Sequence, residues 1–282
     1  MDTVGATDGT DRVSPLQEFE DELKSFRAEV NSALQCMYTF LALNFEATRR
    51  RPVYHVLNRT AQFWNTVLAS LQTTVFIVMG RIFDQNSPHN VDRLLKLAQR
   101  NIHLFSLVEL AKRKQGPASQ PPAWLLDYLA SAYVPKPADF RKLRAHVAKW
   151  RKTYESAYRD LRHRHYAHKE VIDDAEVAAL FARTNIREMC RMLAFLASLQ
   201  RALQSLLLNG GKPVLRPVRF SVQAIKRRRS TLTHTAGVPE RAALDTWAVL
   251  DALLKSPPES LARRRPKRPG WQPRVKVLKS RP

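Results

Sequence analysis

The sequence predicts an all-α protein, an antiparallel helical bundle followed by a basic tail that is largely disordered. Apolar residues recur at spacings of three and four over most of residues 14–209, which is the period of an amphipathic helix. No segment shows the alternation with period two that is typical of a strand, and 44% of the residues are hydrophobic, enough for a sizeable core. Helices that each carry one apolar face pack most simply as a bundle.

The first predicted helix covers about residues 14–48. Ser14 offers an N-cap hydroxyl and Pro15 suits the first turn. The run Arg49–Pro52 ends this helix, either as a solvated end favoured by the helix dipole or as a phosphate contact. A second long helix is expected from Tyr54 to Phe83, and its broad apolar face implies central burial.

Shorter elements follow before the next long helix. Gly, Pro, Ser and Asn mark the breaks between them. In order, we expect a turn over 84–88, a helix capped by Asn90 and running to Arg100, a helix over 102–114, a loop over 115–122, and a short helix over 124–133 stopped by Pro135 and Pro137.

A regular apolar stripe then leads into an unusual segment. Asp139 is expected to cap this helix, and its stripe consists of Phe140, Leu143, Val147, Trp150, Tyr154, Ala157 and Leu161. The same spacing continues to Arg164 and His168, on a face that has so far packed apolar side chains. Polar groups on such a face are buried only if they are paired. The stretch Arg162–His168 is therefore the strongest physical oddity in the sequence.

The last long helix closes the predicted bundle. Asp173 and Asp174 open a short helix to Ala182, and Thr184 is expected to cap a helix that stops at Asn209-Gly210-Gly211. The bundle domain is thus predicted over residues 14–209. Residues 210–282 form the Pro/Arg/Lys-rich tail, in which one short amphipathic helix, over about 239–255, is expected to dock.

The net charge of +22 is concentrated in the tail. Residues 209–282 hold 18 Lys/Arg against 4 Asp/Glu, a net charge of +14, which leaves +8 for residues 1–208. Such a charge favours a polyanion, and RNA is the expected partner of the basic surface and tail. A solubilising extension without a specific partner is the alternative, because charge alone carries no specificity.

The sequence predicts a soluble, cytoplasmic protein with no membrane partner. The N-terminus carries acids and lacks an apolar core region, and the most apolar run, residues 67–79, is interrupted by polar residues and is too short to span a bilayer. Cys36 and Cys190 lie in apolar periodic segments without a CxxC spacing. They are expected to be small buried hydrophobes in a reducing compartment.

The stretch Arg162–His168 contains the residue types that cleave RNA without a metal. Such cleavage needs a base for the 2′-hydroxyl proton, a cation for the phosphate and an acid for the leaving 5′-oxygen. Histidine titrates near neutral pH, and arginine grips two phosphate oxygens at once. The lack of an Asp/Glu cluster argues against a two-metal nuclease. A metal site of His163, His165 and His168 is disfavoured because no Cys or carboxylate neighbour completes it, so no metal or cofactor is expected.

The geometry of a single unbroken helix does not suit this site. Arg162 and His168 would point about 120° apart on such a helix, whereas Arg164 and His168 would share a face. Either the helix ends before His168 or two chains pool their residues in a twofold dimer. Arg164 is interpreted as an interface residue or as a simple exposed charge, and Tyr166 as a packing residue. A structural Arg162–His168 pair at a helix end is the alternative to a phosphate-handling site.

Two stretches resemble the HEPN superfamily, in particular its abortive-infection type. They are LRHRHYAHKE, residues 161–170, and GRIFDQNSPHNVDRLLKL, residues 80–97. An Arg followed four to six residues later by His, between two long helices, is similar to the signature of that superfamily. The resemblance covers about residues 16–208. It implies an all-α, usually dimeric domain whose active members are metal-independent endoribonucleases, often toxins or phage-defence effectors.

The resemblance also implies roles for individual residues. Arg162 matches the family's arginine and His168 its histidine. His163 stands where the family commonly has Asn or Asp, and Glu170 stands where toxins modified by a nucleotidyltransferase antitoxin carry Tyr, so that partner system is not expected. The candidate site therefore comprises Arg162, His168, His163 and Arg164. We expect an endoribonuclease toxin or defence effector that forms a homodimer and has an antitoxin or defence partner. The alternative is a non-catalytic helical dimer that binds nucleic acid or a protein.

Overall fold

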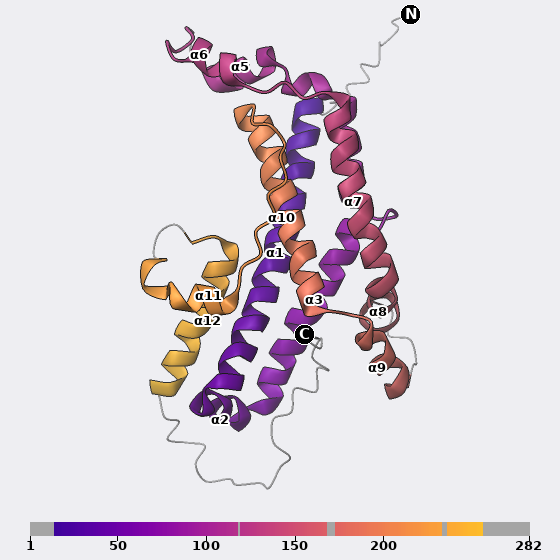
Figure 1. Cartoon of the computed structure of the whole chain (residues 1–282), viewed down its shortest axis with the longest axis vertical. Helices are drawn as coiled ribbons and strands as arrows, with labels where there is room; N and C mark the ends of the chain where they lie inside the picture. Colours follow the sequence, from indigo (N-terminus) through magenta and orange to yellow (C-terminus); the bar gives the residue numbers. More distant parts are fainter. Residues whose placement is uncertain (1–13, 118, 168–172, 233–235, 256–282) are drawn as a thin grey trace, which may run out of the picture.

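The computed structural model describes residues 14–117, 119–167, 173–232 and 236–255, and these residues form helices and loops without a strand. The long helices of the bundle run along the long axis of the molecule (Figure 1). They are α1 (Pro15–Arg49), α3 (Ala61–Phe83), α7 (Pro137–Ala157) and α10 (Ile186–Asn209). α1 and α7 run in one direction, and α3 and α10 run in the other. The predicted all-α antiparallel bundle is confirmed.

α1 is the central helix of the bundle. Its N-cap is the one expected, because the Gln17 N–H donates to Ser14 Oγ at 3.2 Å. α1 packs against α3, α10 and the C-terminal helix α12 (Val238–Lys255). Its buried face holds large apolar side chains along most of its length: Phe19, Leu23, Phe26, Val30, Leu34, Met37, Tyr38, Phe40 and Leu43.

The helix expected over residues 54–83 is two helices, so that prediction is wrong. α2 (Arg51–Arg59) lies across the end of the bundle, and the chain turns at Thr60, with φ −123° and ψ 48°, before α3 begins. Pro52 lies in the first turn of α2, where a proline costs no hydrogen bond. The run Arg49–Pro52 thus ends α1, as expected, and also begins α2.

The opposite end of the bundle is built from short helices. Asn90 caps α4 (Val91–Arg100) as predicted, because the Arg93 N–H donates to Asn90 Oδ1 at 2.9 Å. The single helix expected over residues 102–114 is instead a 3₁₀ turn, η1 (Ile102–Phe105), followed by α5 (Leu107–Gln115). The Ser106 hydroxyl separates them by capping α5. α6 (Leu125–Ser131) is the predicted short helix.

Two predicted caps are displaced by a few residues. Pro137 is the first residue of α7 and does not stop the preceding helix, and Asp139 lies in the first turn, where its Oδ2 accepts the Lys136 N–H at 2.8 Å. Asn185, not Thr184, caps α10, because the Thr184 hydroxyl already donates to the Phe181 carbonyl at 2.8 Å. At each of these helix starts the local sequence offers more than one residue that could form the cap, and the hydrogen bonds of the folded chain decide which residue does so.

The helix that leads to Arg162 is broken before that residue, whereas its apolar stripe predicted a regular helix as far as Leu161. α7 ends at Ala157, and α8 (Arg159–Leu161) is followed by a π-helical segment, η2 (Arg162–Ala167). Tyr158 stands at the break and is fully buried. Its hydroxyl lies 2.9 Å from both the Asn185 carbonyl and Glu188 Oε2. The break is thus anchored to the start of α10, and α9 (Asp174–Ala182) follows with the predicted Asp173 cap.

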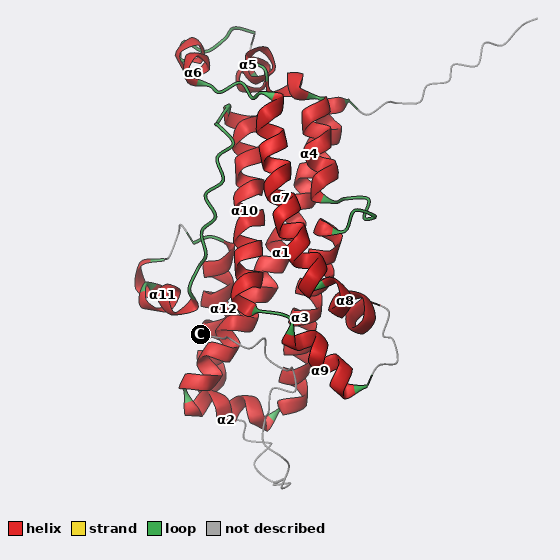
Figure 2. Ribbon diagram, turned by 45° about the vertical axis from the view of Figure 1, so that its right-hand side comes forward, coloured by secondary structure: helices red, strands yellow, loops and turns green. Residues whose placement is uncertain are grey.

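Part of the predicted tail lies on the bundle. α10 ends at Gly210, whose φ of 59° is the left-handed value expected of a glycine stop. The chain then returns along α10 to α11 (Val222–Arg227) and η3 (Arg229–Thr231), as Figure 2 shows. The Arg216 N–H donates to Ser198 Oγ at 2.7 Å, and the Tyr38 hydroxyl donates to the Phe220 carbonyl at 2.9 Å. Residues 210–232, expected to be mostly disordered, are therefore tied to the bundle.

The C-terminal helix docks as predicted, and ion pairs connect it to α1. α12 buries Trp247 and Leu250 against the core. Glu46 of α1 is completely buried and pairs with Lys226 of α11 and, at 3.2 Å, with Arg50. Arg50 and Arg229 also reach Asp251 of α12, at 2.9 Å and 3.0 Å. These five residues, Glu46, Arg50, Lys226, Arg229 and Asp251, are called the Glu46 cluster below.

α3 is a core helix with an apolar composition. Among the described helices, it is the one long and apolar enough to cross a membrane by length and composition, and 50% of that apolar window is buried inside the bundle. The sequence argument that residues 67–79 are too short to span a bilayer is therefore wrong about length, because the whole helix is long enough. Burial of Val75, Phe76 and Met79 against the rest of the core accounts for much of the apolar character.

Candidate functional site

Arg162 lies against the C-terminal part of α3, next to a glycine and an aspartate. Its Nη1 is 3.3 Å from Asp84 Oδ2. Gly80 provides the space for this arginine, because a Cβ atom on Gly80 would stand 2.5 Å from Arg162 Nε. The only glycine within the predicted helical core thus allows a close approach of η2 to α3.

Asp84 is also held in place by hydrogen bonds that do not involve Arg162. It is the C-cap of α3, and its N–H donates to the Gly80 carbonyl at 2.8 Å. Its Oδ1 accepts the Asn86 N–H at 3.1 Å, which leaves Oδ2 directed to Arg162. His163 joins the same group, with Nε2 3.1 Å from Arg162 Nη1 and 3.9 Å from Asp84 Oδ2. The Asp84 carboxylate therefore faces both Arg162 and His163.

Tyr154 completes this group from the last turns of α7. Its hydroxyl and Arg162 Nε are both buried, and neither has a hydrogen-bond partner among the described residues. Burial raises the pKa of Tyr154 to about 12, while the nearby charges of Arg162 and Asp84 act in opposite directions. The phenol therefore keeps its proton at neutral pH and can donate. Arg162, Asp84, His163 and Tyr154 are called the Arg162 cluster below.

The other members of the segment make different contacts. Arg164 pairs with Glu176 of α9 at 2.5 Å. Tyr166 stacks on Phe76 of α3 with ring centroids 4.9 Å apart, so its interpretation as a packing residue is confirmed. His165 lies edge-on to Tyr166 at 4.8 Å. Arg162 thus reaches α3, and Arg164 reaches α9.

His168 lies outside the described residues, so its pairing with Arg162 stays a prediction. The described segment ends at Ala167 and resumes at Asp173. Among the residues that the structure describes, no group of three or more His, Cys, Asp or Glu is placed to hold a metal.

Sequence reasoning missed Gly80, Asp84 and Tyr154 as members of the site. Gly80 and Asp84 were part of the stretch that carries the family resemblance, but nothing in their spacing connects them to an arginine 78 residues further on. Tyr154 was assigned to the apolar stripe, and its ring does stack on Phe83, with centroids 5.7 Å apart. A buried tyrosine that leads into a charged turn was the available signal.

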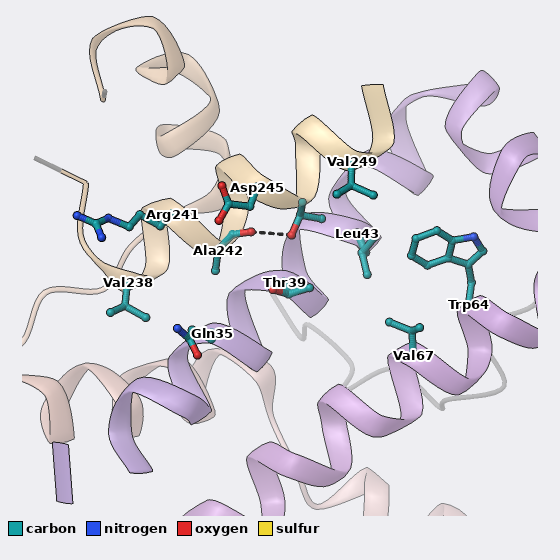
Figure 3. Close-up of a pocket in the computed structure, with 11 residues that line it drawn as sticks. Gln35, Thr39, Leu43, Trp64, Val67, Val238, Arg241, Ala242, Asp245 and Val249 are labelled. Carbon is teal, nitrogen blue, oxygen red and sulfur yellow. Dashed lines mark hydrogen bonds between the residues drawn. The ribbon is translucent and has the colours of Figure 1, made fainter. Parts of the chain in front are cut away.

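A separate groove lies between α1, α3 and α12. Figure 3 shows its mostly apolar walls, and its volume is about 510 Å³. Arg241 and Asp245 of α12 are its charged residues. None of Arg162, His163 and Arg164 lines it, so this groove is not part of the Arg162 cluster. Its lining residues are Gln35, Thr39, Leu43, Trp64, Val67, Val238, Arg241, Ala242, Asp245, Thr246 and Val249.

Comparison with known protein families shows to which family the chain belongs. A family model described as AbiU2 (HEPN_AbiU2) matches residues 16–227, which is most of the chain. The chain belongs to the AbiU2 family of HEPN domains. The matched region of this AbiU2 protein includes the Arg162 cluster and also α11, which the sequence had placed in the tail. The domain boundary at residue 209 stays a prediction. No curated protein and no solved structure matches the chain.

Membership of the AbiU2 family points to a role in abortive-infection defence. The resemblance seen in the stretches around Arg162 and Gly80 is thereby confirmed at the level of the superfamily and of its abortive-infection type.

Proposed function

We propose that this AbiU2 protein is a metal-independent endoribonuclease of abortive-infection defence. Arg162 holds the phosphate that is cut, and His168 acts as the acid or base. The observation that carries the proposal is the Arg162 cluster, in which a positioned arginine retains a buried Nε without a partner among the described residues. The Arg162 side chain keeps 17% of its surface exposed, and a phosphate oxygen is a suitable acceptor for a guanidinium.

The cluster offers suitable groups for each step of the reaction. The 2′-oxygen of a ribose attacks the adjacent phosphorus, its proton passes to a base, and the bond to the 5′-oxygen breaks as an acid protonates that oxygen. Arg162 stabilises the negative charge that builds up on the phosphorus oxygens. His168 and His163 are the proposed proton-transfer groups, because histidine is the residue type used for acid and base catalysis near neutral pH, and Arg164 adds a positive charge in the same segment. The phenol of Tyr154 can donate a further hydrogen bond.

A second copy of the chain completes the site in this proposal. Two proton transfers need two groups, and one chain contributes one His168, while its His163 already contacts Arg162 and Asp84. A twofold dimer that brings two Arg162–His168 segments together supplies both histidines and doubles the positive charge. Control by an antitoxin or another defence protein would act on the same dimer, and the cytoplasm is where its RNA substrate is found.

A non-catalytic helical dimer that binds nucleic acid or a protein is the second candidate. The observation that favours it is the Arg162–Asp84 ion pair, because an arginine that already has a carboxylate partner can serve structure alone.

Cleavage of labelled RNA in EDTA separates the two functions. The wild type is expected to cut, and Arg162→Ala and His168→Ala each lower the rate by about 100-fold or more. Arg81→Ala and His89→Ala are matched controls, because Arg81 pairs with Glu29 on α1 and His89 with Glu22, outside the Arg162 cluster. No cleavage by the wild type, or equal cleavage by all five proteins, would contradict the nuclease.

A further inference from the structure

The outward face of α7 carries an unbroken series of cations. Arg141, Lys142, Lys149 and Lys152 are exposed, and His146 is exposed among them. The exposed residues between these cations are small, Ala145 and Ala148, so nothing screens the charges sterically. No acidic residue occurs between Asp139 and Glu155.

The same helix has a second basic edge whose cations share an acidic partner. Arg144 lies 3.0 Å from Asp92 of α4, and Arg151 lies 3.9 Å from the same carboxylate. Lys96 pairs with that aspartate at 2.8 Å. By contrast, none of the four outward Lys and Arg residues has an ion pair within the described ranges. The two edges of one helix therefore differ in what they leave available for a ligand.

The position of the outward face connects it to the Arg162 cluster. From Arg141 to Lys152 the helix rises about 16 Å, enough to follow several nucleotides of a strand. The C-terminal end of α7 leads into α8 (Figure 1), and η2, which begins at Arg162 and packs on α3, follows directly in the chain. Lysines spaced along a helix suit a polyanion of extended shape better than a small anion, which needs convergent donors.

The other basic segment of the described chain lacks this relation to the cluster. Residues 212–229 hold seven Lys/Arg and no Asp/Glu. Two of these cations, Lys226 and Arg229, are already paired with Glu46 and Asp251. The segment follows α10 toward α11, on the opposite side of the bundle from α8 and α9 (Figure 2).

We propose that the outward face of α7 is the track on which RNA approaches the Arg162 cluster, with phosphates against Arg141, Lys142, Lys149 and Lys152. The identity of the polyanion rests on the proposed nuclease function. The track itself is a binding surface and does not require that the chain cuts RNA.

RNA binding by two matched triple variants tests the track. Lys142→Ala/Lys149→Ala/Lys152→Ala removes three charges from α7, and Arg216→Ala/Arg227→Ala/Arg228→Ala removes three exposed charges from the other segment. Both are made in the full chain with His168→Ala, so that the labelled RNA stays intact, and both are checked for an unchanged melting temperature. The Kd is measured over a series of salt concentrations.

The α7 variant is expected to bind RNA at least about tenfold more weakly, and the slope of log K against log salt falls by about 2. The control variant is expected to change both quantities much less. Equal losses in the two variants, or no RNA binding by the parent protein, would overturn the track. If the parent binds along α7 but the chain with His168 does not cut RNA, the track stands and the nuclease fails. If that chain cuts RNA and the α7 variant binds normally, the nuclease stands and the track fails.

Discussion

Glu46 and Arg162 are both charged side chains within the helical bundle, but their surroundings differ. Glu46 is completely buried, and each of its carboxylate oxygens meets a cation, Lys226 or Arg50. Arg162 has 17% of its side chain exposed and meets Asp84 through Nη1 alone. Its buried Nε and the neighbouring Tyr154 hydroxyl have no hydrogen-bond partner among the described residues.

We interpret this difference as that between a structural charge and, in the proposed nuclease, a phosphate-binding one. A buried charge that serves stability must be fully paired, because each unmet hydrogen bond costs free energy. Unused donors beside a partly exposed arginine are unfavourable in the free protein, and an anionic ligand would relieve that cost. The Glu46 cluster therefore holds the C-terminal helices on α1, while the Arg162 cluster would bind a phosphate in the proposed nuclease.

The largest expected change in stability follows removal of Glu46. Glu46→Ala leaves Lys226 and Arg50 without their buried partner, and the free energy of unfolding is expected to fall by about 2 kcal/mol. This is below the loss typical of a broken buried pair, because the side chains of Lys226 and Arg50 are 36% and 37% exposed and can turn to water. Urea unfolding of wild type and variant measures the difference.

The same variant also tests the separation of the two clusters. A preparation of Glu46→Ala that is still folded is expected to cut RNA at the wild-type rate, because no member of the Arg162 cluster contacts Glu46. Loss of cleavage in the folded variant would show that the C-terminal helices belong to the site.

A smaller effect is expected from the pH dependence of α12 docking. The hydrogen bond from Arg50, and that from Arg229, hold the pKa of Asp251 below its usual value near 4, against the opposing effect of burial. A carboxyl with a lowered folded pKa stabilises the protein above its unfolded pKa and loses that contribution as the pH falls through the folded value. We expect a loss of about 1 kcal/mol as the pH drops below about 4.

Comparison with Asp251→Asn isolates this contribution from that of other acids. Urea midpoints of the two proteins are expected to differ at pH 6 and to converge toward pH 2. A constant difference across that range would show that Asp251 does not titrate in the way described.

Helices whose signals are local could be predicted from the sequence. Ser14, Asn90 and Asp173 each cap the helix expected of them, because an N-cap bond joins residues two or three positions apart. The three-and-four spacing of α1 and α10 gave their buried faces for the same reason. Gly210 ended α10 as a left-handed stop.

Elements that depend on distant partners could not be predicted. The end of α7 at Ala157 is fixed by the buried Tyr158, whose hydroxyl reaches Asn185 and Glu188. The stripe continued through this point in the sequence, so periodicity alone extended the helix too far. Residues 210–232 were assigned to a disordered tail because their composition is basic, whereas Tyr38 and Ser198 bind their backbone.

In the candidate site, too, the sequence indicated only residues that lie close together in the chain. Arg162 and His168 belong to one short motif, which resemblance identified. Asp84 and Gly80 come from another helix, and only the packing of η2 on α3 brings them to the arginine. Glycine lowers the stability of a helix, but Gly80 leaves the space that the guanidinium of Arg162 occupies.

Gly80→Ala is expected to give the smallest change in stability and tests the central claim most directly. The new Cβ would stand 2.5 Å from Arg162 Nε and 2.9 Å from its Cδ, so the arginine must move. A flexible side chain can do so, and alanine favours a helix over glycine by up to about 1 kcal/mol, so the net change in stability is near zero.

The decisive measurement is therefore the rate of RNA cleavage by Gly80→Ala in EDTA, beside its melting temperature, with Ser70→Ala on the same helix as a control. We predict an unchanged melting temperature and cleavage at least about tenfold slower, since every proposed catalytic residue is present but Arg162 is displaced. Cleavage by this variant at the wild-type rate would contradict the claim that the position of Arg162 against α3 is required for cleavage.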